Sequence, residues 1–123
     1  MKILVVDDGV KTLEMLQANL ENYGFTVETA INGAQAISKA ETGSPDAVIL
    51  DIKMPDMDGW QVCKTLKSNL LTKEIPIIFL TAFSKKEDFD RAKQLGAFLF
   101  LTKPVDLNGL AAILRHLAVP KYF

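Results

Sequence analysis

The sequence predicts an α/β domain in which helices cover both faces of a parallel, doubly wound sheet. Short apolar runs alternate with stretches of helical periodicity, five of each along the chain. Four of these runs, all except the second, are apolar on consecutive residues, as expected for strands covered on both faces. An alternation of this kind favours parallel strands joined by helical crossovers.

The first half of the chain contains three predicted strands and two predicted helices. The second strand, TVETA, alternates apolar and polar residues, which is typical of an edge strand. The first helix carries leucines 13, 16 and 20 on one stripe, and glycines 24 and 43 follow the two helices. In chain order these elements are Lys2–Val6, Val10–Asn22, Thr26–Ala30, Ala34–Glu41 and Ala47–Leu50.

The second half of the chain continues the alternation and adds signals for helix ends. Ser84 is a candidate N-cap with Glu87 three residues later, the spacing of a capping box. Asp106 is another candidate N-cap, and Gly96 marks a helix end. The helix after Ser84 has few apolar anchors, so we expect it to be held weakly. In chain order the elements are Trp60–Ser68, Ile77–Leu80, Lys86–Leu95, Phe98–Leu101 and Leu107–Leu117.

The composition is that of a globular domain and argues against several classes of function. The formal net charge is −1, so we expect no direct binding to nucleic acid or to a membrane. No apolar run reaches the roughly 18 residues of a membrane span. The single cysteine, Cys63, cannot form an internal disulfide, and we expect a cytoplasmic location. The predicted domain covers residues 1–119, with 120–123 as a tail or the start of a linker.

Chemically active side chains follow four of the five predicted strands. Asp7 and Asp8 follow the first strand, Asp51 the third, Thr81 the fourth and Lys103 the fifth. Ligands of parallel α/β sheets bind outside the carboxyl ends of the strands, so we expect these groups to converge. Three carboxylates that lie close together raise one another's pKa unless a cation lies among them. Their oxygen ligands suit Mg²⁺.

This set of groups fits phosphoryl transfer, which depends mainly on positioning and charge neutralisation. A carboxylate can act as the nucleophile and form an aspartyl-phosphate. Asp51 is the best candidate because it stands alone at its strand end, which leaves the adjacent acid pair to hold a metal. Lys103 can neutralise a phosphoryl group, and Thr81 can donate a hydrogen bond to it.

Four sequence stretches carry a family resemblance: ILVVDD, DAVILDIKMPDMDG, PIIFLTA and FLFLTKP. In this order and spacing they resemble the receiver domain of two-component response regulators, from Lys2 to about Leu117. Each stretch alone is weak evidence, but the four together are highly specific. The resemblance implies a five-stranded, flavodoxin-like sheet of order 2-1-3-4-5 with five helices, as in single-domain chemotaxis receivers.

The resemblance also implies a phosphorylation site. Asp51 would accept a phosphoryl group from a histidine kinase or a histidine phosphotransfer protein. Asp8 would bind Mg²⁺ (or Mn²⁺) directly, Asp7 mainly through water, and the backbone carbonyl of Lys53 would be a further ligand. Such a domain is not an enzyme for external substrates, although it assists its own phosphorylation and slow dephosphorylation.

A switch is implied as well. Thr81, with the backbone N–H of Ala82, would hold a phosphoryl oxygen, and Lys103, followed by a cis bond to Pro104, would contact the same group. On activation Thr81 would move toward the phosphate and Phe100 would turn inward. This would change the face of the fourth helix, fifth strand and fifth helix. An effector protein or output domain docks there, and a monomer could form a phosphorylation-dependent dimer.

Three positions depart from the family pattern. Gly9 replaces a larger, often acidic residue, and Val105 stands where Phe is frequent. Phe83, two residues after Thr81, would either shield the phosphoryl bond from water or gate access to it. None of the three removes a group that the mechanism needs.

Plainer interpretations of single residues remain open. Phe100 also fits a static core aromatic, and Asp56 and Asp58 fit surface acids of a turn. His116 fits a surface residue near a helix end better than a phosphoacceptor. Trp60 fits a packing residue, as does Cys63.

Other functions are weighed against the receiver. One is a receiver-like interaction module that works without phosphorylation. Another is a haloacid-dehalogenase-type phosphatase, but that family uses an Asp-x-Asp pattern after its first strand, whereas these acids are adjacent. Dinucleotide binding lacks its Gly-x-Gly-x-x-Gly turn.

Overall fold

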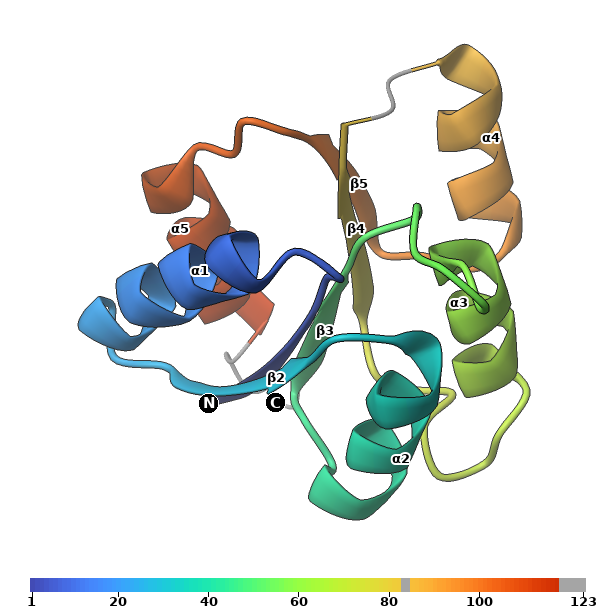
Figure 1. Ribbon diagram of the computed structural model, residues 1–123, viewed down its shortest axis with the longest axis horizontal. Coiled ribbons are helices and arrows are strands. Elements are labelled where there is room, and N and C mark those ends of the chain that lie inside the picture. The colour runs from blue at the N-terminus through green and yellow to red at the C-terminus, as the bar shows by residue number, and fades with distance from the viewer. Residues whose placement is uncertain (83–84, 118–123) are drawn as a thin grey trace, which may run out of the picture.

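The computed structural model describes residues 1–82 and 85–117, which form one five-stranded parallel sheet with five helices (Figure 1). The strand order is β2-β1-β3-β4-β5, so the predicted fold class and order are confirmed. The strands are β1 (Lys2–Val6), β2 (Thr26–Ala30), β3 (Ala47–Leu50), β4 (Ile77–Thr81) and β5 (Leu99–Thr102).

Helices cover the sheet on both faces. Helices α1 and α5 lie on one face, and α2, α3 and α4 lie on the other (Figure 1). Successive residues of β1 point to opposite faces, so Ile3 packs with one helical layer and Leu4 with the other. The helices are α1 (Val10–Asn22), α2 (Gly33–Gly43), α3 (Gly59–Lys67), α4 (Lys86–Gln94) and α5 (Leu107–Leu117).

The register of the sheet aligns the ends of its central strands. Val6 of β1 pairs with Leu50 of β3, and Leu50 pairs with Phe79 of β4. The residues after Val6 and Leu50 are Asp7 and Asp51. These two acids, far apart in sequence, therefore lie side by side at the carboxyl ends of neighbouring strands.

The fifth strand is covered on both faces, as predicted, with Phe100 against one helical layer and Leu99 and Leu101 against the other, but less completely than the central strands. All four residues of β5 are only partly buried, because β5 pairs with β4 alone. It forms one edge of the sheet, and β2 forms the opposite edge. The strand also begins one residue later than predicted. Phe98 precedes it and has an exposed fraction of 45%, so Phe98 and Phe100 do not form one buried stripe.

Helix α4 begins at Lys86, as predicted. Its N-cap is Lys85, which makes no side-chain capping bond. The predicted capping box of Ser84 with Glu87 cannot be compared with this, because Ser84, like Phe83, lies outside the described residues. Only Ala92 of α4 is buried, which confirms the prediction of few apolar anchors. None of the helices within 1–82 and 85–117 is long and apolar enough to cross a bilayer.

Candidate functional site

The carboxyl ends of β1 and β3 bring three acids together. One carboxylate oxygen from each of Asp7, Asp8 and Asp51 lies within 4.8 Å of the others. Asp7 and Asp51 are buried, with exposed fractions of 4% and 8%, while Asp8 faces solvent. The predicted convergence of the three acids is therefore present. Among the residues 1–82 and 85–117 it is the one cluster of this kind.

Lys103 bridges the two buried acids. Its Nζ lies 2.8 Å from Asp7 Oδ2 and 3.5 Å from Asp51 Oδ2. The backbone N–H of Lys103 donates to the Thr81 carbonyl at 2.8 Å, which fixes the start of the β5–α5 loop against β4. The bond from Lys103 to Pro104 is cis, as the resemblance implied. Lys103 thus supplies a protein cation beside the two acids.

Backbone donors fix the remaining carboxylate oxygens. Gly9 N–H donates to Asp7 Oδ1 at 2.8 Å, and Ile52 N–H donates to Asp51 Oδ1 at 2.8 Å. Because Oδ1 of each acid is held by the backbone, Oδ2 of each faces Lys103. Both carboxylates are therefore orientated as well as placed.

Thr81 ends β4 beside these acids and is almost fully buried, with an exposed fraction of 1%. Its side chain forms a hydrogen bond with Asp51, which lowers the pKa of that carboxyl. Thr81 and Asp51 lie at the ends of adjacent strands, so the contact follows from the sheet order. The structure thus brings together Asp7, Asp8, Asp51, Thr81 and Lys103, as the sequence predicted.

Burial shifts the titration of the central acid. The pKa of Asp51 is raised above its ordinary value of 3.8, first by burial and then by the charge of Asp7. Lys103, the Ile52 N–H and Thr81 oppose this rise but do not cancel it. Because burial and the charge of Asp7 disfavour the ionised form of Asp51, the site favours binding of a further cation or a proton.

Lys103 shows the complementary shift. Burial, the largest single influence, lowers the pKa of the ammonium, but the hydrogen bond to Asp7 and the charge of Asp51 together outweigh it. The net result is a raised pKa, so Lys103 stays charged at neutral pH.

Helix α3 begins directly behind Asp51. Gly59 N–H donates to the Ile52 carbonyl at 2.7 Å, and a Cβ on Gly59 would lie only 2.1 Å from the Asp51 carbonyl oxygen. A side chain at this position would therefore push the loop after Asp51 out of place.

The first turn of α3 is held by a capping box that sequence reasoning missed. Asp58 accepts from the Gln61 N–H at 3.0 Å, and the Gln61 side chain accepts from the Asp58 N–H at 3.1 Å. Asp58 is thus a helix cap, not merely a surface acid, whereas Asp56 is exposed as predicted. The Asp-x-x-Gln spacing was the available signal.

Other predicted residues occupy separate positions. Phe100 is half-buried and packs against Phe79, Phe89 and Trp60. The side chain of Lys53, two residues after Asp51, is exposed. Metal binding by its backbone carbonyl stays a prediction. His116 is exposed, as expected.

Trp60 and Cys63 are buried packing residues, as predicted. Burial raises the pKa of the Cys63 thiol to about 11. This thiol is protonated at neutral pH and is a poor nucleophile there.

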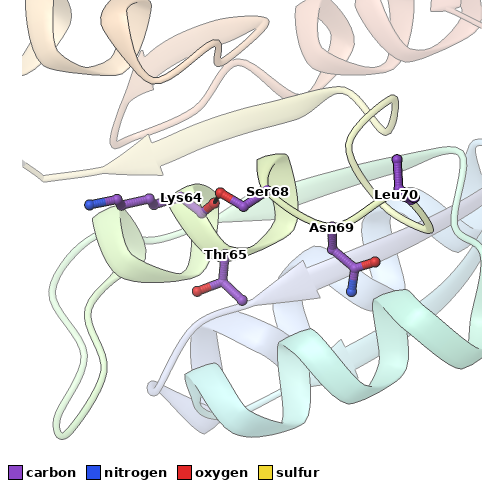
Figure 2. A pocket seen from close by; sticks show the side chains of 5 residues that line it. All are labelled: Lys64, Thr65, Ser68, Asn69 and Leu70. Atoms are coloured by element: carbon purple, nitrogen blue, oxygen red, sulfur yellow. Dashed lines mark hydrogen bonds between the residues drawn. The ribbon is translucent and has the colours of Figure 1, made fainter.

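A cavity elsewhere on the chain is a poorer candidate. It has a volume of about 620 Å³ and lies at the end of α3, where it is lined by Lys64, Thr65, Ser68, Asn69 and Leu70 (Figure 2). Lys64 extends away from Asn69 and Leu70, so the polar groups do not converge. None of its lining residues belongs to the acid cluster.

Comparisons with known proteins agree with the geometry. The family model described as the response regulator receiver domain matches residues 3–115. The alkaline phosphatase synthesis transcriptional regulatory protein PhoP of Bacillus subtilis is 47% identical, over 94% of this chain and 49% of the relative. The response regulator PleD of Caulobacter vibrioides is 40% identical, over 94% of this chain and 26% of the relative. The chain thus spans about half or less of these relatives' length.

Solved structures share the fold closely. The chemotaxis protein CheY4 of Vibrio cholerae has a TM-score of 0.88 at 33% identity, covering 94% of this chain and 97% of the other. The receiver domain of a signal transduction histidine kinase from Syntrophus aciditrophicus has a TM-score of 0.87 at 35% identity, covering 99% and 94%.

Proposed function

This chain belongs to the response regulator receiver domain family, and we propose that Asp51 is its phosphoacceptor. It is a receiver domain of two-component signalling, and receiver domains carry a phosphorylatable aspartate and use Mg²⁺. The observation that supports Asp51 is its central place in the site. Its carboxylate lies within reach of Asp7 and Asp8 and 3.5 Å from Lys103 Nζ.

The donor set fits a hard divalent cation. Mg²⁺ prefers carboxylate and carbonyl oxygens and retains several waters. Asp8 is exposed and can offer its carboxylate directly, while both oxygens of Asp7 already accept hydrogen bonds. This difference supports direct binding by Asp8, with Asp7 acting mainly through water. The Lys53 carbonyl, in the loop after Asp51, is the proposed further ligand. When bound, Mg²⁺ (or Mn²⁺) supplies charge neutralisation for the incoming phosphoryl group.

The orientation of Asp51 selects the reacting oxygen. The Ile52 N–H holds Oδ1, so Oδ2 is the oxygen that attacks phosphorus. A P–O bond forms as the P–N bond of a phosphohistidine donor breaks, and the electron pair of that bond stays on the imidazole. Lys103 pairs with the transferred group, and the Thr81 hydroxyl donates a hydrogen bond to it.

The switch follows from the same contacts. A new bond from Thr81 to the phosphoryl group favours the inward position of Phe100, and this changes the face of α4, β5 and α5. Receiver domains are signalling domains, not classical enzymes. This one catalyses only its own phosphorylation from a donor and its own dephosphorylation.

Partners follow from the family and from the length of the relatives. The phosphoryl donor is a histidine kinase or a histidine phosphotransfer protein in the cytoplasm. The recipient of the signal is an effector protein or an output domain, since transcriptional regulators are among the relatives that the chain spans in part. The receiver covers residues 1–119 with 120–123 as a tail or linker, and it exists as a monomer or a phosphorylation-dependent dimer. It does not itself bind nucleic acid or a membrane.

Phosphorylation of a single variant pair tests the assignment. Incubation with Mg²⁺ and acetyl phosphate should give an acid-stable, base-labile adduct in the wild type. Asp51→Asn should abolish it, and the matched control Asp56→Asn, an exposed acid of the following loop, should keep it. Mass spectrometry reads the adduct.

Three other outcomes would contradict the assignment. An adduct that persists in Asp51→Asn would reject Asp51 as the acceptor. If the wild type forms no adduct and binds no beryllofluoride, it is a phosphorylation-independent module. Efficient turnover of a generic phosphomonoester would instead indicate a phosphatase.

A further inference from the structure

The side chain of Phe100 lies in an aromatic cluster that spans three elements. Its ring centroid is 6.5 Å from that of Trp60 in α3, with the two planes only 22° apart. It is 4.4 Å from Phe89 in α4 and 6.1 Å from Phe79 in β4. The one aromatic that connects β5 to both α3 and α4 is therefore Phe100, within the described part of the chain.

Trp60 is the fixed member of this cluster. Its exposed fraction is 7%, and it also packs on Phe79 with centroids 5.0 Å apart. It follows Gly59, whose backbone holds the Ile52 carbonyl behind the phosphoacceptor. Phe100, by contrast, lies on an edge strand and is only half-buried, so solvent is an alternative environment for its ring.

Arg91 adds a connection between Trp60 and α4. Its guanidinium carbon lies 4.6 Å from the centre of the Trp60 ring, within the range of a cation–π contact. Because Ala92 is the only buried residue of α4, this contact and Phe89 supply much of the attachment of that helix.

We propose that Trp60 is the surface that receives Phe100 in its inward position, and that Arg91 ties this surface to α4. Both are then positioning residues for the switch, not catalytic residues. This inference rests on the proposed function, because it assumes that phosphorylation of Asp51 favours the inward position. These contacts are already present in this structure, and they strengthen the apparent binding of the selecting ligand to the extent that they are stronger when Phe100 is inward than when its ring faces solvent.

Beryllofluoride with Mg²⁺, an analogue of the phosphoryl group, tests the proposal, and its affinity can be measured by fluorine NMR. Trp60→Leu should weaken binding about two- to tenfold, the range of an aromatic pair, and Trp60→Phe should restore most of it. Arg91→Met should weaken binding about two- to fivefold. The matched control is Arg115→Met, which removes the other arginine–aromatic contact, 5.4 Å from the Tyr23 ring centre, and should change nothing.

Fluorescence gives an independent readout, since Trp60 is the only tryptophan. Beryllofluoride should change its emission in the wild type, and Phe100→Leu should remove most of that change while Asp51 still binds. Wild-type affinity in a folded Trp60→Leu, or an undiminished emission change in Phe100→Leu, would overturn the proposal and leave the phosphoacceptor intact. If Trp60→Leu does not fold, Arg91→Met and Phe100→Leu decide the same question. Failure of the wild type to bind would overturn the proposed function and this inference together.

Discussion

At the scale of single residues, Asp51 is placed for chemistry at a cost to folding. Its carboxyl is buried beside Asp7, and its pKa is raised despite the neighbouring Lys103. An acid with a higher pKa in the folded state destabilises that state once the pH exceeds the ordinary value of 3.8. Stability is therefore lost as the pH rises from there through the folded-state pKa.

Replacing this acid should stabilise the protein without metal. We expect Asp51→Asn to raise the free energy of unfolding by about 1 kcal/mol at neutral pH, because the repulsion from Asp7 and the desolvation cost outweigh the lost attraction to Lys103. The gain should shrink as the pH falls toward 3.8 and vanish below it, where the wild-type carboxyl is protonated in both states. Urea unfolding in chelator at several pH values measures it.

The control for this experiment is Asp56→Asn, since Asp56 is exposed and lies outside the acid cluster. Adding Mg²⁺ should reduce the difference in free energy of unfolding between Asp51→Asn and the wild type, because the ion stabilises the wild type more. A less stable Asp51→Asn in chelator would show that the Lys103 attraction dominates instead.

Much of the site at this scale could be predicted, because Asp7, Asp51 and Thr81 each terminate an apolar run. Their meeting depends only on strand order and register. The pairing of Lys103 with Asp7 could not be predicted, because it depends on side-chain rotamers across 96 residues of sequence separation. The cap at Asp58 could have been found from its spacing to Gln61.

At the scale of elements, α4 is the weakest attached helix. It buries one residue, whereas α1 and α5 bury three each. Its N-cap residue, Lys85, also makes no side-chain capping bond to the first turn. Local opening should therefore cost less in α4 than in the other helices.

Hydrogen exchange checks this expectation. Amides of Lys86–Gln94 should exchange at least about tenfold faster than those of Leu107–Leu117, which corresponds to an opening free energy lower by about 1.4 kcal/mol. Similar protection in the two helices would show that Phe89 and Arg91 hold α4 as firmly as a buried stripe does.

Element boundaries were predictable where periodicity and a turn residue coincide. Gly24 and Gly96 both adopt positive φ, and the helices before them end within a residue or two. The burial of β5 was not predictable in this way, because LFLT is as apolar as a central strand. Only the absence of a neighbour beyond β5 in the sheet leaves its residues half-covered.

At the scale of the whole molecule, the phosphorylation site is a property of the complete sheet. Lys103 contacts Asp7 across 96 residues and Asp51 across 52 residues of sequence separation. No single βαβ unit contains all of these groups, so the site is expected to form only with the native sheet. The sequence could predict this sheet order only through the family resemblance, because alternation alone does not fix the order of strands.

The buried thiol of Cys63 can report how often the packing of α3 against the sheet opens. Cys63 has no exposed surface and a pKa of about 11, so an alkylating reagent meets it only when the layer over α3 opens. We expect labelling by iodoacetamide to be at least about a hundredfold slower in the native protein than in urea-unfolded chains. Equal labelling rates in the native and unfolded protein would mean that Cys63 is readily exposed in the native state. Slower labelling would instead report how often α3 separates from the sheet.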